Sequence, residues 1–344
     1  MGTPAELNFD PAEIVSSLYQ GILGRMPDEV GKAYFIRLLG EGRPLAEIVR
    51  QFVNSPEFQR SRVVSLGPLD ALPANRIELD LAAAQRDLVW LRIAKAWSEW
   101  GKEDPYLSVL GSDEFRMENI SAAQVERFYD SGEPNIDRVQ RYLARHGRQL
   151  PKDGTCVDYG CGLGRTTLWL ARQCERVLAI DVSEPHLALA RENLKARGVH
   201  NVEFHLLQSR SDLQLLHGID FFHSVIVLQH NPPPIIFDIL TQVFEGLNDE
   251  GTAFFQVPTY GVNYSWEFEK FAVESLPQPG AEMHVLPQSN IFALAATAGC
   301  LPLEVQPDGW TGIPHLISNT FLFAKSAANG QLQRAVLERE PGEP

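Results

Sequence analysis

Short, strongly apolar segments alternate with amphipathic ones from Asp153 onward. Apolar runs predict strands at 155–157, 177–180, 201–208, 220–228 and 251–257. Between them, apolar side chains recur at helical spacing, as at Leu187, Ala190 and Leu194. This alternation of strands and helices is typical of a parallel α/β sheet, and the nearly continuous apolar run at 220–228 is typical of a strand buried on both sides.

The first part of the chain has a helical pattern instead. Residues 8–61 carry three short segments of apolar periodicity separated by turn residues, which predicts a small helical domain. Residues 62–76 contain Gly67, Pro68 and Pro73, so we expect a linker there.

Residues 77–149 predict further helices ahead of the sheet, one from Ile77 to about Trp100 and another over 136–145. Three tryptophans are spaced along the first of them: Trp90, Trp97 and Trp100. An aromatic stripe on a helix belongs more often to a core than to a substrate cage, so we interpret it as core. We expect residues 77–149 to form a cap on the α/β domain.

The junction between the first strand and the following helix is rich in glycine. It reads Asp158-Tyr159-Gly160-Cys161-Gly162-Leu163-Gly164-Arg165. Glycines at such a junction let the backbone approach a ligand closely, and the start of the helix supplies free N–H groups. Asp181 ends the next strand, about twenty residues further on, where a carboxylate accepts hydrogen bonds from ribose hydroxyls. The two features together predict a nucleoside-binding site.

The glycine spacing separates two kinds of nucleoside ligand. A dinucleotide-binding turn has the pattern G-x-G-x-x-G, and its third glycine allows close helix–strand packing. Here that position holds the bulky Arg165. The observed pattern, Asp158 followed by Gly160, Gly162 and Gly164, resembles the first motif of the class I S-adenosylmethionine (SAM)-dependent methyltransferases.

This resemblance implies a fold and a reaction for residues 150–326. The fold is a Rossmann-like α/β sheet of seven strands, mostly parallel, with helices on both faces, preceded by the α-helical N-terminal domain and the helical cap. The last two strands, at 302–305 and 320–324, are similar to the antiparallel hairpin that ends this family's sheet. The reaction is an in-line transfer of a methyl group from SAM (EC 2.1.1.-), which leaves S-adenosylhomocysteine (SAH) and relies mainly on alignment of the reactants.

The resemblance also implies which residues bind the cofactor. The glycine turn would lie against the amino-acid part of SAM, and Asp158 would reach its ammonium through water, unless the carboxylate only caps local backbone donors. Asp181 would hold the ribose hydroxyls, and Val182 would lie against the adenine. The cofactor-binding residues that we expect are Asp158, Tyr159, Gly160, Cys161, Gly162, Gly164, Asp181, Val182, Gln208, Ser209 and Leu228.

The end of the third strand departs from the family pattern. Many members carry an acidic residue there that binds the adenine amino group, but this chain has Gln208 and Ser209. Either of these side chains can accept that hydrogen bond, or Asp212 reaches it from further along.

Two interpretations compete at the end of the fourth strand, which reads Leu228-Gln229-His230-Asn231-Pro232-Pro233-Pro234. Enzymes that methylate amines carry an Asn-Pro-Pro-aromatic motif there, whose Asn side chain accepts a hydrogen bond from the substrate amine. In this chain Asn231 would have that role, but Pro234 stands where the motif has its aromatic residue. In the small-molecule branch a histidine often follows this strand, and the prolines start the next helix. We favour the second interpretation. His230 is then a candidate general base for a hydroxyl group, or a hydrogen-bonding residue on the pocket floor.

The N-terminal domain has a resemblance of its own. The segments Tyr19–Asp28 and Asn54–Phe58 look like a bacterial helical domain of unknown function, distantly similar to phycobilisome linker domains. That domain is often attached to surface or glycan-related proteins, which implies docking to a protein partner and, by analogy alone, a glycan acceptor. A purely structural appendage remains the alternative.

Composition and charge limit the classes of binding partner and the cellular compartment that we expect. The formal net charge is −14 and no Lys/Arg run occurs, so we expect no nucleic-acid substrate. The start of the chain has no leader pattern, and no run approaches the roughly eighteen apolar residues of a membrane span. The four cysteines form no C-x-x-C pair, so we expect buried thiols in a reducing cytoplasm. The sequence shows no cluster of His, Cys, Asp or Glu at metal-ligand spacing, so we expect no metal site. Residues 327–344 have the composition of a mobile tail.

We therefore predict a cytoplasmic SAM-dependent methyltransferase that acts on an oxygen of a small molecule or saccharide. One alternative is N-methylation through Asn231-Pro232-Pro233. Another is a SAM-binding module without catalysis, in which the N-terminal domain carries the function.

Overall fold

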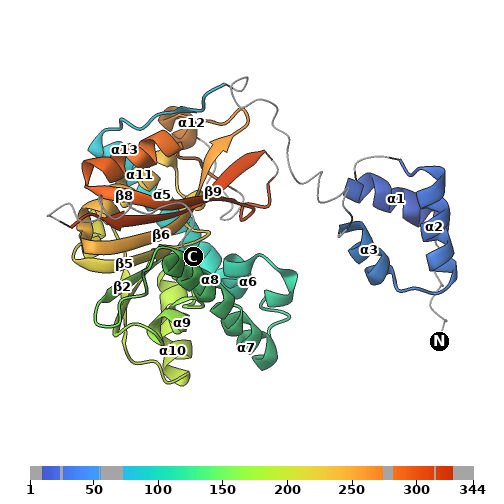
Figure 1. Ribbon diagram of the computed structural model, residues 1–344, viewed down its shortest axis with the longest axis horizontal. Helices are drawn as coiled ribbons and strands as arrows, with labels where there is room; N and C mark the ends of the chain where they lie inside the picture. The colour runs from blue at the N-terminus through green and yellow to red at the C-terminus, as the bar shows by residue number, and fades with distance from the viewer. Residues whose placement is uncertain are drawn as a thin grey trace. The chain divides into compact units, whose positions relative to one another are not determined.

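The computed structural model describes residues 10–23, 26–53, 55, 73–273, 282–313 and 315–327. The chain divides into two compact units, within residues 1–72 and 73–344 (Figure 1). Residues 62–72 of the predicted linker and residues 328–344 of the predicted tail lie outside the described residues.

The N-terminal unit consists of three short helices, as the sequence predicts. They are α1 (Pro11–Leu23), α2 (Glu29–Gly40) and α3 (Leu45–Val53). The side chain of Asp28 accepts a hydrogen bond of 2.8 Å from the N–H of Gly31 and so caps the start of α2. Five side chains form the buried core of this unit: Val15, Tyr19, Leu38, Ile48 and Phe52.

The larger unit is built on a seven-stranded sheet. Its strands are β2 (Thr155–Tyr159), β3 (Arg176–Asp181), β4 (Val202–Leu206), β5 (Ile219–Ser224), β6 (Leu247–Gly261), β8 (Cys300–Asp308) and β9 (Leu316–Lys325). The spatial order is β4-β3-β2-β5-β6-β9-β8. The first five strands in this order are parallel, and β9 runs antiparallel to both β6 and β8. The predicted Rossmann-like, mostly parallel sheet is confirmed.

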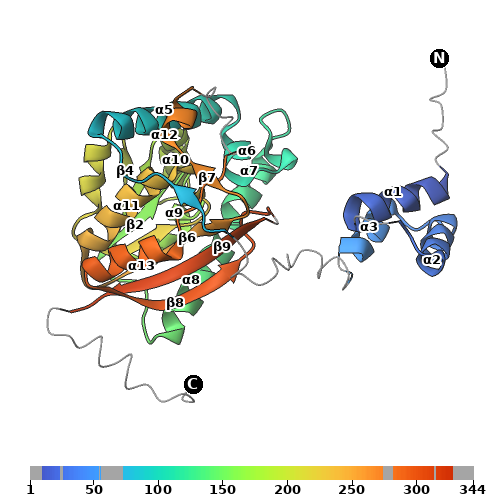
Figure 2. The same cartoon turned by 90° about the horizontal axis from the view of Figure 1, so that it is seen from above.

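Helices cover both faces of the sheet, because its strands are apolar on both sides (Figures 1 and 2). On one face lie α5 (Ala83–Glu103), α11 (Pro233–Gly246) and α13 (Gln288–Thr297). On the other face lie α8 (Glu133–Arg145), α9 (Thr167–Ala171) and α10 (Glu184–Ala196). The cap continues through the short helices α6 (Pro105–Leu110) and α7 (Ala122–Asp130). Neighbouring residues of one strand serve different cores: Phe222 faces the α5 and α11 side, and Phe221 faces the α8 side.

The larger unit begins earlier than the sequence predicts. The long helix starts at Ala83, not at Ile77, because Arg76 and Ile77 form strand β1, which pairs with β7 (Ser265–Trp266). The side chain of Asn75 also hydrogen-bonds both backbone groups of Gly261, at 3.0 Å to its N–H and 2.6 Å to its C=O. Residues 73–76 therefore belong to this unit and not to the linker. The partners, β7 and Gly261, lie far along the chain, so local periodicity does not reveal this pairing.

The fourth strand of the sequence analysis also ends early. Strand β5 stops at Ser224, and residues 228–230 form a turn of 3₁₀ helix, η4 (Leu228–His230), instead of continuing the strand to Leu228. Ile226 has a φ of 60°, a left-handed conformation that is strained for a β-branched residue by about 1–3 kcal/mol. The side chain of Gln256 supports it by accepting a hydrogen bond of 3.0 Å from the Ile226 N–H. The strand thus gives way to a loop at the carboxyl edge of the sheet.

Candidate active site

A cavity opens at the carboxyl ends of β2, β3 and β5, under the cap helices α5 and α6. Open α/β sheets bind their ligands at this edge. The empty space between its walls is about 1050 Å³, open solvent at the mouth included. The structure brings nine of the predicted residues into its walls: Asp158, Tyr159, Gly160, Cys161, Gly162, Asp181, Val182, His230 and Asn231.

Four predicted cofactor residues lie outside these walls. Gly164 serves helix packing, because a Cβ there would come within 2.9 Å of the Leu194 side chain. Leu228 is fully buried in the core next to α11. Gln208 is exposed, and Ser209 starts a 3₁₀ turn. The neighbouring residues Val227 and Leu207 line the cavity in place of Leu228 and Gln208.

The carboxylate of Asp212 is occupied by the backbone. It accepts hydrogen bonds of 2.8 Å from the N–H of Gln208 and 2.9 Å from the N–H of Ser209. It therefore caps the 3₁₀ helix η3 (Arg210–Leu216), as an acidic residue at this position of a capping box does. The side chain does not line the cavity.

Asp181 joins the end of β3 to the glycine turn. One carboxylate oxygen accepts a hydrogen bond of 2.8 Å from the N–H of Gly162, and the other accepts one of 2.9 Å from the N–H of Ser183. Asp181 is 9% exposed and lines the cavity. An ionised carboxylate has about four acceptor sites, so it can bind two hydroxyl groups while it keeps both backbone bonds.

The glycine turn itself requires glycine at two positions that line the cavity. Gly160 and Gly162 have φ angles of 71° and 52°, which L-residues with a side chain rarely adopt. A Cβ on Gly160 would lie 2.3 Å from Val227, and one on Gly162 would lie 3.0 Å from Val109 of α6. The turn is therefore held closely between the loop after β5 and the cap.

Asp158 does not cap local backbone donors among the described residues, which is the alternative that the sequence leaves open for it. It is buried, with 2% exposure, and its hydrogen-bond donors are side chains and not the local backbone. One oxygen lies 2.9 Å from Nδ1 of His223, and the other accepts bonds from the hydroxyl groups of Thr166 and Thr167, at 3.0 and 2.6 Å. His223 also lines the cavity, and the sequence analysis missed it. Its only signal is its place on the strand beside Asp158, which becomes visible once the strand order and register are known.

His230 lies in the cavity wall in a defined tautomer. Its Nδ1 is 3.1 Å from the carbonyl oxygen of Glu282, and because a carbonyl only accepts, Nδ1 carries the hydrogen. Nε2 is then the acceptor, 3.3 Å from the amide nitrogen of Gln229. Burial lowers the pKa of His230 to about 4, which the Glu282 carbonyl partly opposes. The imidazole is therefore neutral at pH 7.

Asn231 contributes to the loop that carries His230. Its amide nitrogen donates a hydrogen bond of 2.9 Å to the carbonyl of Val227 and so closes the 3₁₀ turn between them. Pro232 is the N-cap of α11 and Pro233 and Pro234 are its first two residues, where their missing N–H groups cost little. The prolines start a helix, as the favoured interpretation predicts.

The tryptophan stripe of α5 is divided between core and cavity. Trp90 is buried in the core, in agreement with the sequence interpretation. Trp97 instead lines the cavity, with its ring edge-on to His230 at a centroid distance of 5.3 Å. Trp97 is also partly buried and packs against the same core, so the core interpretation is incomplete for this residue, and spacing along the helix does not reveal its contact with the cavity.

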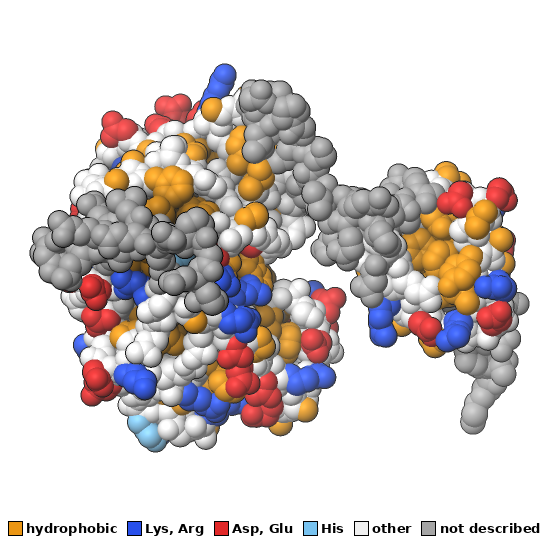
Figure 3. Space-filling view, in the orientation of Figure 1, with side chains coloured by type: hydrophobic (Ala, Val, Ile, Leu, Met, Phe, Trp, Pro, Cys, Tyr) orange, Lys and Arg blue, Asp and Glu red, His pale blue; other side chains and the backbone are white. Residues whose placement is uncertain are grey.

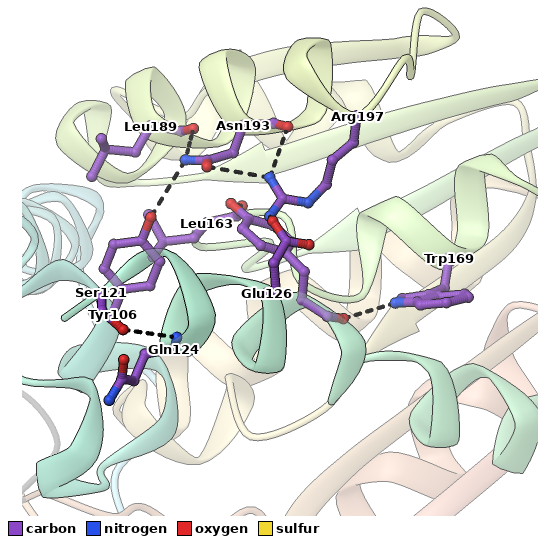
Figure 4. Close-up of polar contacts among 10 residues, drawn as sticks. Tyr106, Ser121, Gln124, Glu126, Leu163, Trp169, Leu189, Asn193 and Arg197 are labelled. Atoms are coloured by element: carbon purple, nitrogen blue, oxygen red, sulfur yellow. Dashed lines mark hydrogen bonds and ion pairs between the residues drawn. The ribbon is translucent and has the colours of Figure 1, made fainter.

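The cap is fastened to the sheet domain beside the glycine turn (Figure 4). The buried hydroxyl of Tyr129, on α7, donates a hydrogen bond of 2.8 Å to the carbonyl of Leu163 in the turn. The indole of Trp169 donates one of 2.8 Å back to the carbonyl of Tyr129. Arg197 of α10 pairs with Glu126 at 2.6 Å and lies over the Tyr129 ring. These contacts connect the position of the cap to the shape of the turn.

Comparisons with known proteins agree with this architecture. Residues 156–251 match the model of a methyltransferase domain, and residues 5–62 match a domain of unknown function, DUF4214.

The curated relatives match only over a short stretch. A tRNA/tmRNA (uracil-C(5))-methyltransferase of Nitratiruptor sp. is 39% identical over 79 residues, which are 22% of this chain and 22% of the relative. The enzyme of the same name from Escherichia coli is 33% identical over 72 residues, 21% of this chain and 20% of the relative. The chain thus matches about a fifth of the length of these relatives.

Among solved structures, magnesium protoporphyrin IX methyltransferase from Synechocystis with bound SAH superposes with a TM-score of 0.47. It is 15% identical in sequence, and the superposition covers 68% of this chain and all of the other.

Proposed function

We propose that this chain, which carries a methyltransferase domain at 156–251 and a DUF4214 domain at 5–62, binds SAM and transfers its methyl group to an oxygen of a small-molecule acceptor. The observation that carries the proposal is the hydrogen bond between Asp181 and the N–H of Gly162 in the cavity wall. It sets a buried carboxylate, suited to a ribose diol, beside a turn that has glycine at positions 160 and 162 of the cavity wall.

The residues of the cavity fit the three parts of the cofactor. Val182, Leu207 and Ile93 supply apolar surface for an adenine, and Asp181 supplies the acceptor for the ribose. Further along the wall, Asp158 and Arg165 give the polar surroundings that an amino-acid group needs. When bound, SAM supplies a methyl group that its positive sulfur has already activated.

An oxygen acceptor is supported by the state of His230. Its Nε2 is an acceptor in the cavity wall and makes only a long contact of 3.3 Å with the amide nitrogen of Gln229, which a substrate hydroxyl can replace to be oriented by the imidazole. With a pKa of about 4, His230 is a weak base, so we expect it to contribute more by aligning the hydroxyl with the methyl group than by removing the hydroxyl proton. The amide nitrogen of Asn231 is engaged in the loop, and its oxygen remains available to accept a hydrogen bond from the N–H of an amine. N-methylation is therefore the second candidate.

The walls that face the acceptor favour a small, largely apolar molecule over a saccharide. The cap contributes mainly apolar side chains there: Trp97, Val109 and Leu110. A saccharide would place many hydroxyl groups against this surface, and unpaired hydroxyls are costly to bury. The glycan acceptor thus rests on the analogy of the N-terminal domain alone.

Nucleic acid remains a poor candidate acceptor in this proposal, although the curated relatives act on tRNA. The chain has a net charge of −14, and acidic and basic side chains are interspersed on the face of the larger unit that Figure 3 shows. Polyanion binding depends on many neutralised phosphates. An RNA substrate is therefore tested as a control and not proposed.

The remaining predictions concern location and partners. No helix among the described residues has the length and apolar character to cross a membrane. All four cysteines are unpaired and buried, which supports our proposal of a reducing cytoplasm. A protein partner for residues 8–61 stays a prediction.

Acceptor screening with methyl-labelled SAM tests the proposal. Pools of phenols and alcohols, amines, saccharides and bulk tRNA are incubated with wild type, His230→Gln and Asn231→Ala. We expect label in a hydroxyl compound, with turnover lowered at least ten-fold by His230→Gln and less than three-fold by Asn231→Ala. The reverse pattern on an amine would establish the second candidate, and label in tRNA or saccharide alone would refute the proposed acceptor class.

A further inference from the structure

His223 and Asp158 form a buried pair at one end of the cavity. They are register partners on the adjacent parallel strands β5 and β2, so their side chains emerge side by side. Nδ1 of His223 lies 2.9 Å from a carboxylate oxygen of Asp158, and each residue is 2% exposed. The ring of Phe254 lies parallel to the imidazole and makes the surroundings apolar.

The hydrogen bonds of Asp158 determine which nitrogen of His223 carries the proton. Burial favours the neutral carboxylic acid, but the hydrogen bonds from His223, Thr167 and Thr166 outweigh it and lower the pKa of Asp158. An ionised carboxylate only accepts, so Nδ1 of His223 donates to it. In the neutral imidazole, Nε2 is then left with a lone pair.

That lone pair has no partner within the described part of the chain. Nε2 of His223 is buried without a hydrogen bond, and the residue lines the cavity. A buried polar atom left unpaired is destabilising, and natural proteins rarely keep one without a reason. A donor group on a ligand, above all a cationic one, would satisfy it, because the charge of Asp158 lies directly behind the ring.

A buried cation lines the same cavity. Arg165 follows the glycine turn, and its guanidinium is held by the cap. Nη1 donates 2.7 Å to the carbonyl of Ser131, and with the Asn135 amide turned so that its oxygen faces the guanidinium, Nη2 donates 2.7 Å to that oxygen. Burial lowers the pKa of Arg165 to about 10, against the attraction of Asp158, so the side chain stays charged at pH 7. The cavity thus presents two groups to a ligand: the uncharged acceptor Nε2 of His223, which has the Asp158 carboxylate behind it, and the charged guanidinium of Arg165.

We propose that this end of the cavity binds the amino-acid group of the cofactor, with His223 Nε2 accepting a hydrogen bond from its ammonium and Arg165 facing its carboxylate. The inference rests on the proposed function. An α-amino acid carries one cationic donor and one anion close together, which is the complement of these two side chains. Asp158 acts through His223 as a positioning residue, in place of the water-mediated contact that the sequence suggested.

Calorimetry with matched ligands tests the inference on the full chain. The ligands are SAH, its analogue that lacks only the α-amino group, and 5′-methylthioadenosine, which lacks the whole amino-acid group. The proteins are wild type, His223→Phe and the control His217→Phe. His217 is an exposed histidine that lies outside the cavity walls. We expect wild type and the control to bind SAH at least ten-fold more tightly than the deaminated analogue. His223→Phe should remove this preference and leave the affinity for the deaminated analogue within about two-fold.

Each other result contradicts the inference in an identifiable way. Equal weakening of both ligands by His223→Phe would mean that His223 is only structural, and an unchanged preference would mean that the ammonium binds elsewhere. If SAH binds but wild type does not distinguish the two ligands, the inference fails while the proposed function stands. If no adenosyl ligand binds, the proposed function fails and this assignment with it.

Should His223→Phe not fold, nitrogen NMR of the wild type decides instead. The imidazole of His223 is assigned through its backbone. SAH should shift the Nε2 resonance towards that of a hydrogen-bonded, unprotonated nitrogen, and the deaminated analogue should not. An identical response to both ligands would overturn the inference.

Discussion

The carboxylate of Asp181, at the end of β3, accepts a hydrogen bond of 2.8 Å from the backbone N–H of Gly162, nineteen positions earlier in the turn after β2. The bond connects the two features of the cavity wall that a nucleoside requires, an acceptor for its sugar and a turn that has glycine at positions 160 and 162. It also means that the shape of the turn and the orientation of the carboxylate depend on each other.

Gly160→Ala should destabilise the larger unit more than a change at another left-handed glycine. Gly198 has a similar φ, 74° against 71°, but a methyl group added there would meet nothing within 4 Å, whereas one on Gly160 would lie 2.3 Å from Val227. Gly198→Ala should cost about 1–2 kcal/mol for the backbone alone. Gly160→Ala should cost a further ~1 kcal/mol or more, on the order of an overpacked site.

Urea unfolding followed by tryptophan fluorescence measures this difference. All six tryptophans lie in the larger unit, so the signal reports on that unit alone. Equal losses for the two variants would show that the loop around Val227 moves aside freely, contrary to the packing described.

Tyr129→Phe should loosen the cap. The change removes the donor to the Leu163 carbonyl and leaves that buried oxygen unpaired, which costs about 1–3 kcal/mol of unfolding free energy. Tyr260→Phe is the matched control, because its hydroxyl donates over a similar 2.9 Å to the carbonyl of Pro73 but at the surface. The control should change stability by no more than about 0.5 kcal/mol. Chemical unfolding of both variants makes the comparison, and similar losses would argue against a role of Tyr129 in holding the turn.

The stability of the protein should rise with pH between about 4 and 6.5, in part because of His230. Its pKa is lowered from 6.5 to about 4 by burial, so in this window the unfolded chain binds a proton that the folded chain does not. The unfolded state then binds more protons, and unfolding free energy increases with pH by up to about 1.4 kcal/mol per unit for one such group. This contribution is fully present above pH 6.5 and is lost as the pH falls towards 4.

His230→Gln should reduce that slope without removing it. His186, which is buried against Ser108, also has a pKa lowered by burial and keeps acting in the same direction. The measurement is a series of urea titrations from pH 4 to 7.5 on wild type and the variant. Superimposable slopes would mean that His230 titrates alike in both states and is not buried as described.

The sequence predicts the strand, the glycine turn and Asp181 better than it predicts the other side chains that line the cavity. The strand, the glycine turn and Asp181 follow one another within a short stretch, so their relationship is readable from local pattern. His223 is different, because it becomes a neighbour of Asp158 only through the register of two strands 65 residues apart. Trp97 shares the stripe of Trp90, and only the extent of the sheet beneath α5 decides which of them reaches the cavity.

The boundary of the fourth strand shows a second limit. The apolar run continues to Leu228, but the left-handed backbone of Ile226 ends the strand at Ser224. Nothing in a Val-Ile-Val-Leu segment predicts such a conformation, since β-branched residues favour extended backbone. Gln256, on the neighbouring strand, stabilises it from a distance in sequence that local reasoning does not cover.

Calorimetric titration with SAM and SAH, on wild type and Asp181→Ala, tests the central claim most directly. Arg191→Ala serves as the control, because this exposed side chain pairs with Glu184 at the surface of α10 and lies outside the cavity walls. We expect micromolar binding of both ligands by wild type and the control, and a loss of affinity of at least ten-fold in Asp181→Ala while its unfolding transition remains cooperative. Folded wild type that binds neither ligand, or an Asp181→Ala variant that binds both as tightly as wild type, would contradict the central claim.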